Sequence, residues 1–234
     1  MIEQQIFPII IALSYALFLY FLTHLMPHAK KHRQLIINMT GGLMFAYIFL
    51  TLIPEIIIHS GELARVAAFS MFVGYIGFYL AEKRTFAALG KQISIKQKVI
   101  FIRSAGIHLI HFITGFILVY TYDQTNLFQT FILLVPLTLH IIATTLLYED
   151  LTKWSKETID EKFVLPFLIF IGSVLAIALT HLFNFPLILF YAFFGGTFVY
   201  LITTILHPRH DQAPITYFIF GIFMYIVLLL IGNF

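Results

Sequence analysis

Two apolar runs of the sequence, residues 99–121 and 127–148, carry polar side chains that could do chemistry inside a membrane. In the first run, polar and small residues recur at steps of three or four: Ser104, His108, His111 and Gly115. In the second run, polar residues recur at steps of four: His140, Thr144 and Tyr148. Thr145 follows directly after Thr144. These steps place each set on one face of a helix. The sequence therefore predicts two helices, each with one polar stripe.

The histidines of these stripes are expected to reach one level near the middle of the membrane. At about 1.5 Å of rise per residue, His108 and His111 lie about 14 and 18 Å from the cytoplasmic edge. By the same measure His140 lies about 12 Å from that edge. Side chains lean toward the N-terminus of their helix, and the two helices run in opposite directions. His111 and His140 are therefore expected to face each other.

Three histidines at one depth could form a metal site, a proton relay or a hydrogen-bonded structural cluster. Neutral imidazole suits Zn, Cu, Fe and Ni. Neither run has Asp or Glu at this depth, so a divalent ion there would keep most of its charge. Core histidines satisfied by Thr or Tyr partners therefore stay an alternative to metal or substrate contact.

The remaining histidines lie near the ends of apolar runs and are interpreted as interfacial: His24, His28, His32, His59, His207 and His210. Glu55 follows Pro54 at the end of another run. Two interpretations of Glu55 stay open, a charge in an outer vestibule and a solvated carboxylate at a helix end.

The composition defines the elements that position these residues. The 234 residues are 60% hydrophobic and 11% charged, whereas a soluble domain carries roughly 25% charge. This excludes soluble, disordered, coiled-coil and nucleic-acid-binding classes, and the absence of Cys excludes disulfides and thiolate metal sites. A membrane helix needs about 20 mostly apolar residues. Eight runs of this kind predict an all-α polytopic membrane protein: 5–26, 35–58, 64–81, 99–121, 127–148, 163–182, 186–206 and 215–232.

The distribution of positive charge predicts the orientation of these spans. Twelve of the 14 Lys and Arg residues lie in the loops after the first, third, fifth and seventh runs. Loops rich in Lys and Arg stay in the cytoplasm, so both termini are expected outside, in the cell membrane. The longest of these loops is expected at 82–98.

Two of the runs share a pattern that suggests an internal repeat. Gly41-Gly42 is followed twelve residues later by Pro54, and Gly195-Gly196 is followed at the same distance by Pro208. The two runs cross the membrane in opposite directions, as an inverted repeat requires. The repeats would be about 5–82 and 163–232, with 99–148 between them. The alternative is that the Gly pairs only permit close helix packing.

Both patterned runs resemble helices of the ZIP (Zrt/Irt-like) metal transporters. The stretch from Gly41-Gly42 to Leu52-Ile53-Pro54-Glu55 resembles their second helix, and that from Gly195-Gly196 to His207-Pro208 their seventh. The resemblance implies one transmembrane domain over 1–234, with eight helices in a 3+2+3 inverted-repeat architecture. It also implies movement of divalent zinc, iron or manganese toward the cytoplasm, commonly by homodimers.

The resemblance also implies an ion site on the fourth and fifth helices. The family's fourth-helix motif, aligned on Gly115, covers residues 110–115, and its fifth-helix motif, aligned on His140, covers residues 140–145. Within these stretches, Thr114 and Thr145 stand at positions that are acidic in the family. The candidate ion-binding residues are His108, His111, Thr114, His140, Thr144 and Thr145, with His111 and His140 as the metal ligands.

These features predict a ZIP-like membrane transporter for a metal cation or a related small solute. The alternative is a transport-inactive ZIP-like membrane protein that acts by binding a partner. An intramembrane metalloenzyme is disfavoured, because it would need a general acid or base and no Asp or Glu lies at mid-membrane depth. We therefore expect no enzyme activity, no cofactor apart from a transported divalent or soft metal ion, and no nucleic-acid partner.

Overall fold

The computed structural model describes residues 2–88, 95–124, 127–152, 161–183, 187–205 and 215–232. All regular elements within these ranges are helical. The longer helices are α1 (Ile2–Ala29), α2 (Arg33–Tyr47), α4 (Ala64–Ala88), α5 (Ile95–Gln124), α6 (Leu127–Thr152), α7 (Glu161–Phe183), α8 (Leu187–Ile205) and α9 (Ile215–Gly232). The shorter elements are α3 (Ile53–His59), the π-helix η2 (Ile48–Leu52), and the 3-10 helices η1 (Lys30–His32) and η3 (Gly61–Leu63).

Because α2, η2 and α3 follow one another without a break, they form a single rod over 33–59. Together with the other long helices, this rod makes eight helical rods in the described residues. Each of the eight predicted runs overlaps one rod, and several rods extend past the predicted run. The expectation of an all-α fold is confirmed for the part of the chain that the structure describes.

Several helices run past the apolar segments that predicted them. α4 continues to Ala88 and α5 begins at Ile95, so much of the predicted loop 82–98 is helical. Residues 82–88 contain Glu, Lys, Arg and Ala, which favour helix, and no Pro or Gly interrupts them. The helix therefore continues where the apolar composition ends.

Six rods of the described residues are long and apolar enough to cross a membrane: the 33–59 rod, α4, α5, α6, α8 and α9. α1 and α7 contain shorter apolar segments, Phe7–Leu22 and Val164–Thr180. Helices satisfy their own backbone hydrogen bonds, as a hydrocarbon environment requires. These properties are compatible with an integral membrane protein.

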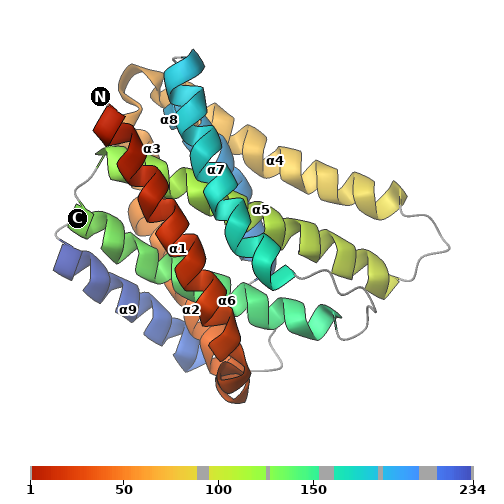
Figure 1. Cartoon of the computed structure of the whole chain (residues 1–234). Helices are drawn as coiled ribbons and strands as arrows, with labels where there is room; N and C mark the ends of the chain where they lie inside the picture. Colours follow the sequence, from red (N-terminus) through yellow and green to blue (C-terminus); the bar gives the residue numbers. More distant parts are fainter. Residues whose placement is uncertain are drawn as a thin grey trace.

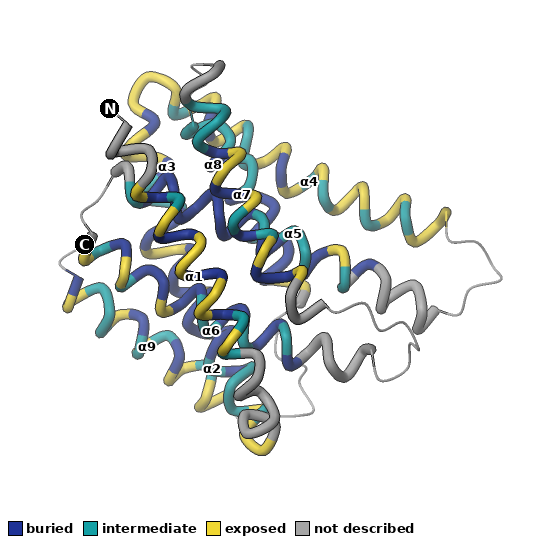
Figure 2. Tube along the Cα trace, in the orientation of Figure 1, coloured by how far each residue is buried: buried dark blue, intermediate teal, exposed yellow. Residues whose placement is uncertain are grey.

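The outer helices expose apolar side chains instead of burying them. Only 11% of the apolar segment of α4 and 17% of that of α9 is buried. Phe69 and Phe72 on α4, and Ile219 and Phe223 on α9, are more than half exposed. Figure 2 shows exposed positions along the length of α4, while the middle of the bundle is buried. Exposed apolar surface of this extent favours contact with lipid over contact with water.

Three pairs of helices approach so closely that only glycine fits at the crossing. A Cβ atom at Gly42 on α2 would collide with the carbonyl oxygen of Phe218 on α9. A Cβ atom at Gly196 on α8 would collide with the carbonyl oxygen of Met71 on α4, and one at Gly115 on α5 with that of Ile169 on α7. Gly42 and Gly196, one from each Gly pair of the sequence, therefore pack directly against neighbouring helices. Small residues at such crossings are typical of membrane helices.

Both chain ends lie at the same end of the bundle, close to α3 (Figure 1). α1 leaves this end, the 33–59 rod returns to it, and the later helices alternate in the same way. α5 and α6 pass through the middle, where α5 contacts α6, α7 and α8, and α6 contacts α2. The two helices that carry the polar stripes therefore form the centre of the bundle.

Candidate functional site

α5 presents His111 to the interior of the bundle. The His111 side chain is 1% exposed, and its Nδ1 lies 2.8 Å from the carbonyl oxygen of Ile107, one turn earlier. Because a carbonyl oxygen only accepts hydrogen bonds, Nδ1 must carry the proton. In the neutral ring, Nε2 then keeps the lone pair with which an imidazole binds metal. A backbone carbonyl bound to the other ring nitrogen is the usual arrangement for a metal-binding histidine.

His108, one turn before His111, has the same local geometry. Its Nδ1 lies 2.7 Å from the carbonyl oxygen of Ser104. His108 is half-buried and interacts electrostatically with His111. It therefore lies at the edge of the buried region that contains His111.

α6 places His140 at the centre of the bundle. The His140 side chain is 0% exposed, and neither ring nitrogen has a hydrogen-bond partner among the described residues. Its ring packs against the Phe198 ring of α8, edge to face, with 5.4 Å between the ring centres. His140 interacts electrostatically with His111 across the α5–α6 contact. The two predicted residues therefore lie buried on neighbouring helices.

The predicted threonines line the same helices but use their hydroxyl groups locally. Thr114 donates a hydrogen bond to the carbonyl oxygen of Ile110 at 2.9 Å, and Thr144 donates to that of His140 at 2.9 Å. Both side chains are fully buried, whereas Thr145 is half-buried. A hydroxyl that donates to its own helix keeps its lone pairs, so Thr114 and Thr144 can still accept a hydrogen bond or contact a cation.

Several predicted positions lie outside the described part of the chain. They are the side chains of Tyr148, His24 and His28, and residues 206–210 with His207 and His210. Within the described residues, no group of three or more His, Asp or Glu side chains is close enough to hold a metal ion. The central site therefore consists of two buried imidazoles, with hydroxyl groups on the same helices.

A second polar cluster, which the residue pattern does not predict, lies at the α3 end of the bundle. The Tyr191 hydroxyl on α8 donates a hydrogen bond to Oε2 of Glu55 at 3.1 Å. Tyr47 and Tyr191 are both buried, and Glu55 is half-buried. Glu55 therefore has a hydrogen-bond donor in the protein and is not a carboxylate that only water contacts. Tyr191 lies 136 positions from Glu55 in the sequence, so no local pattern could connect the two residues.

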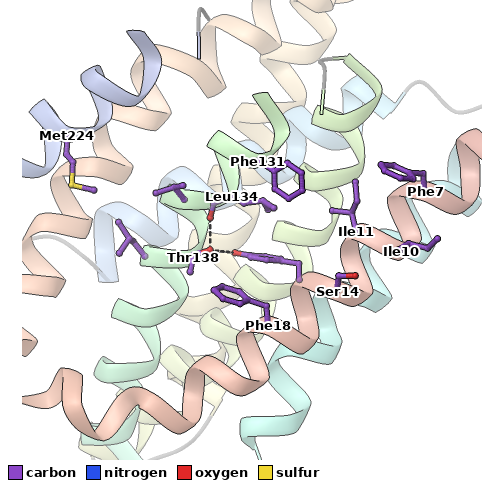
Figure 3. Close-up of a pocket in the computed structure, with 12 residues that line it drawn as sticks. Phe7, Ile10, Ile11, Ser14, Phe18, Phe131, Leu134, Thr138 and Met224 are labelled. Carbon is purple, nitrogen blue, oxygen red and sulfur yellow. Dashed lines mark hydrogen bonds between the residues drawn. The ribbon is translucent and has the colours of Figure 1, made fainter. Parts of the chain in front are cut away.

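A groove of about 700 Å³ lies between α1 and α6 (Figure 3). Its walls are mainly apolar, with Phe18 and Phe131 among the lining residues. Inside it, the Tyr15 and Thr138 hydroxyls lie 3.0 Å apart, and Thr138 donates to the carbonyl oxygen of Leu134. None of the six predicted site residues lines this groove, so it is separate from the central histidines.

Comparisons with protein-family models, with curated proteins and with solved structures found no match to this chain.

Proposed function

We propose that this chain is a membrane transporter that moves a metal cation, or a related small solute, through a site between α5 and α6. The observation that carries the proposal is the buried pair His111 and His140, in which both nitrogens of His140 lack a partner among the described residues. A buried polar group left without a hydrogen bond costs about 1–3 kcal/mol. A ligand that binds the His140 ring would remove this cost.

The chemistry of the two rings selects the class of ligand. Neutral imidazole binds Zn, Cu, Fe and Ni, and the proton on Nδ1 of His111 leaves its Nε2 available. Thr114 and Thr144 supply neutral oxygens on the same helices. Since no carboxylate belongs to this set, an ion would keep much of its charge and bind weakly. Weak binding suits a transported ion better than a permanently bound one.

The helix pairing supports the ZIP-like, 3+2+3 part of the proposal. In an inverted repeat over 5–82 and 163–232, the 33–59 rod corresponds to α8, and α4 corresponds to α9. The α2–α9 crossing would then be equivalent to the α8–α4 crossing, and each has a glycine contact on both helices, at Gly42 and Gly221 and at Gly74 and Gly196. We include in the proposal the cell membrane as location, both termini outside, and a homodimer.

The test is metal uptake into proteoliposomes that contain the purified full-length chain. Wild-type protein should take up at least one ion from a panel of Zn²⁺, Fe²⁺, Mn²⁺, Ni²⁺ and Cu⁺. His111→Ala and His140→Ala should each abolish uptake. His32→Ala is the matched control, because His32 is exposed and is not one of the predicted site residues, and it should transport normally.

Two results would contradict the proposal. Equal uptake by wild type and by both central variants would show that the ion does not pass the histidine pair. A wild-type protein that transports none of these ions, and that purifies without metal, would instead support the partner-binding alternative.

A further inference from the structure

α1 and α6 are neighbours without the glycine contacts of the closest helix pairs. The α5–α7 crossing has glycine on both helices, because a Cβ atom at Gly172 on α7 would collide with the carbonyl oxygen of Phe112, next to the contact of Gly115. The sequences of α1 and α6 contain no glycine. Side chains therefore keep their two backbones apart, and the groove of about 700 Å³ lies between them. Sites for small molecules have volumes of roughly 300–1,000 Å³.

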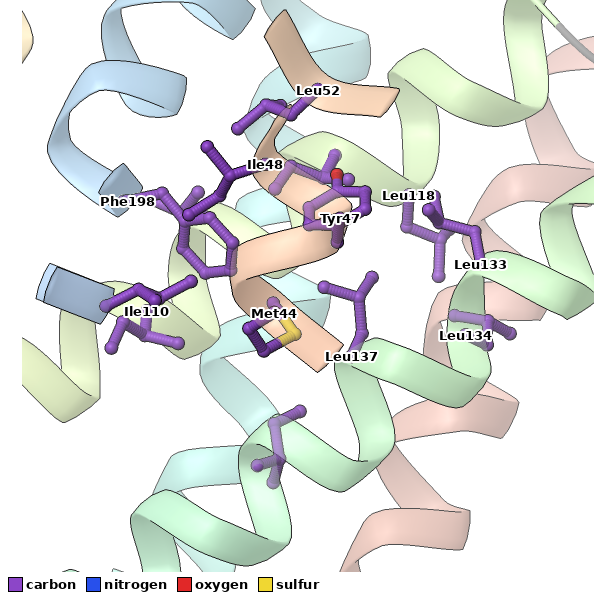
Figure 4. Close-up of a cluster of buried hydrophobic side chains, with 14 of the residues drawn as sticks. Met44, Tyr47, Ile48, Leu52, Ile110, Leu118, Leu133, Leu134, Leu137 and Phe198 are labelled. Carbon is purple, nitrogen blue, oxygen red and sulfur yellow. The ribbon is translucent and has the colours of Figure 1, made fainter. Parts of the chain in front are cut away.

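The groove opens on the outer, apolar surface of the bundle. One side of α6 packs inward, where Leu133 and Leu137 belong to the buried cluster around Tyr47 of the 33–59 rod (Figure 4). The groove side of α6 carries Phe131 and Val135, which are 53% and 39% exposed. Three side chains of the α1 wall are exposed in the same way: Phe7, Ile10 and Phe18. In a bilayer, such a groove takes up hydrocarbon in preference to water.

Two hydroxyl groups line this groove, and their hydrogen atoms are both in use. Thr138 on α6 donates to the carbonyl oxygen of Leu134 at 2.6 Å (Figure 3). A hydroxyl has only one hydrogen, so Tyr15 on α1 must be the donor in its 3.0 Å contact with Thr138. The Tyr15 oxygen then keeps both of its lone pairs. The pair can therefore accept a further hydrogen bond but cannot donate one.

Both hydroxyl groups belong to residues near the middle of the apolar segments of their helices. Tyr15 is central in the segment Phe7–Leu22 of α1, and Thr138 is close to the centre of Phe128–Leu146 of α6. Charged groups are costly at the middle of a membrane, and phospholipid headgroups lie outside its hydrocarbon core. A donor for the Tyr15 oxygen must therefore come from an uncharged molecule that enters the hydrocarbon region.

Ser14 adds a second polar group on the α1 wall of the groove (Figure 3). It directly precedes Tyr15, and its side chain is exposed. A serine hydroxyl can both donate and accept a hydrogen bond. A ligand hydroxyl could therefore donate to the Tyr15 oxygen and accept from Ser14. An ether or a carboxylate has no hydrogen to donate to Tyr15.

We propose that the α1–α6 groove binds an uncharged alcohol with a long hydrocarbon part, which reaches the site from the bilayer. Its hydroxyl donates to the Tyr15 oxygen, and its hydrocarbon part lies between Phe18 and Phe131. A carboxylate or phosphate is disfavoured, because its oxygens would face the lone pairs of Tyr15 and bring charge to the middle of the membrane. The site uses neither His111 nor His140, so it does not rest on the proposed transport.

The experiment is photolabelling of the purified full-length chain in lipid nanodiscs, with chelator present and without metal ions. Two diazirine probes of equal chain length are compared: hexadecanol, and its methyl ether, which lacks the donor. Mass spectrometry identifies the labelled residues. Hexadecanol should label the groove residues of α1 and α6 severalfold more than the ether does, as expected for one additional hydrogen bond, and unlabelled hexadecanol should compete.

Two results with the wild-type chain would overturn the proposal. Equal labelling by both probes would mean that the groove only contacts hydrocarbon. No labelling of the groove by either probe, as when a second copy of the chain covers it, would mean that the alcohol has no access.

Substitutions test which hydroxyl accepts the hydrogen bond. Tyr15→Phe, which removes only the hydroxyl, should reduce labelling by hexadecanol to the level of the ether. Thr138→Val frees the Tyr15 hydrogen, so labelling by the ether should rise relative to hexadecanol. Tyr217→Phe is the matched control, because Tyr217 is exposed on α9 and does not line the groove, and it should have no effect. Undiminished labelling of Tyr15→Phe, or an equal loss with Tyr217→Phe, overturns the proposal.

Discussion

The two central histidines differ in how their ring nitrogens are used. Nδ1 of His111 has a carbonyl partner, whereas both nitrogens of His140 are buried without one in the described part of the chain. Without a ligand, burial of the His140 ring therefore lowers the free energy of unfolding. Burial of the His111 ring lowers it less, because one of its nitrogens has a partner. This difference gives the two residues opposite expected responses to an apolar replacement.

His140→Leu should stabilise the metal-free protein. The substitution removes two unsatisfied polar atoms, and we expect the free energy of unfolding to rise by about 1–3 kcal/mol. The measurement is thermal or denaturant unfolding in detergent with chelator present. His111→Leu is the control and should not stabilise, because it loses a satisfied hydrogen bond. A destabilised His140→Leu protein would mean that the ring has a structural partner, and would count against an empty ligand position.

If a metal binds at the centre, its two imidazole ligands should behave as one unit. His111→Ala and His140→Ala should each remove bound metal, and the double variant should lose no more than either single variant, because both ligands serve one site. Metal analysis of the purified variants checks this. Additive partial losses would indicate two separate sites.

At the scale of helices, glycine contacts determine which rods lie side by side. Gly74 and Gly77 provide a matched comparison on α4. A Cβ atom at Gly74 would collide with the carbonyl oxygen of Phe193 on α8, whereas one at Gly77 would meet no atom within 4 Å. Both positions are glycines on the same helix and lie only three residues apart, so they differ mainly in what surrounds them.

Gly74→Leu should therefore destabilise the protein, as should Gly42→Leu and Gly196→Leu. Overpacking typically costs about 1–3 kcal/mol, and a collision with backbone leaves little room for adjustment. Gly77→Leu should be neutral or slightly stabilising, because leucine has the higher helix propensity. Thermal unfolding and size-exclusion profiles in detergent measure both effects. Equal behaviour of the Gly74 and Gly77 variants would mean that the α4–α8 crossing is looser than described.

At the scale of the whole molecule, the proposed orientation places the C-terminal end of α4 on the cytoplasmic side. Arg84 and Glu62 are both exposed; Arg84 lies near the C-terminal end of α4, and Glu62 lies on η3, just before the N-terminal end of α4. The chain has no Cys, so a single Cys can be introduced at either position for labelling. The positive-inside rule predicts that position 62 is labelled from outside intact cells and position 84 only after permeabilisation. The reverse pattern would invert the proposed orientation.

The sequence alone was sufficient for the helices and their approximate ends. A membrane-spanning segment must be apolar over about 20 residues and must satisfy its backbone internally, so length and composition identify it. The polar stripe with His111 on α5 and the one with His140 on α6 could be read in the same way, because helical spacing is a local property. Their burial at the centre agrees with that prediction.

The tertiary structure decided the rest, for two physical reasons. The core and the lipid-facing surface of such a bundle are both apolar, so composition could not distinguish buried Ile110 from exposed Phe69. The π-turn Ile48–Leu52 changes the phase of the 33–59 rod, so the position of Glu55 relative to Tyr47 is set by the folded helix. Contacts between helices distant in sequence, such as Tyr191 with Glu55, depend on that phase and on which glycines allow close approach.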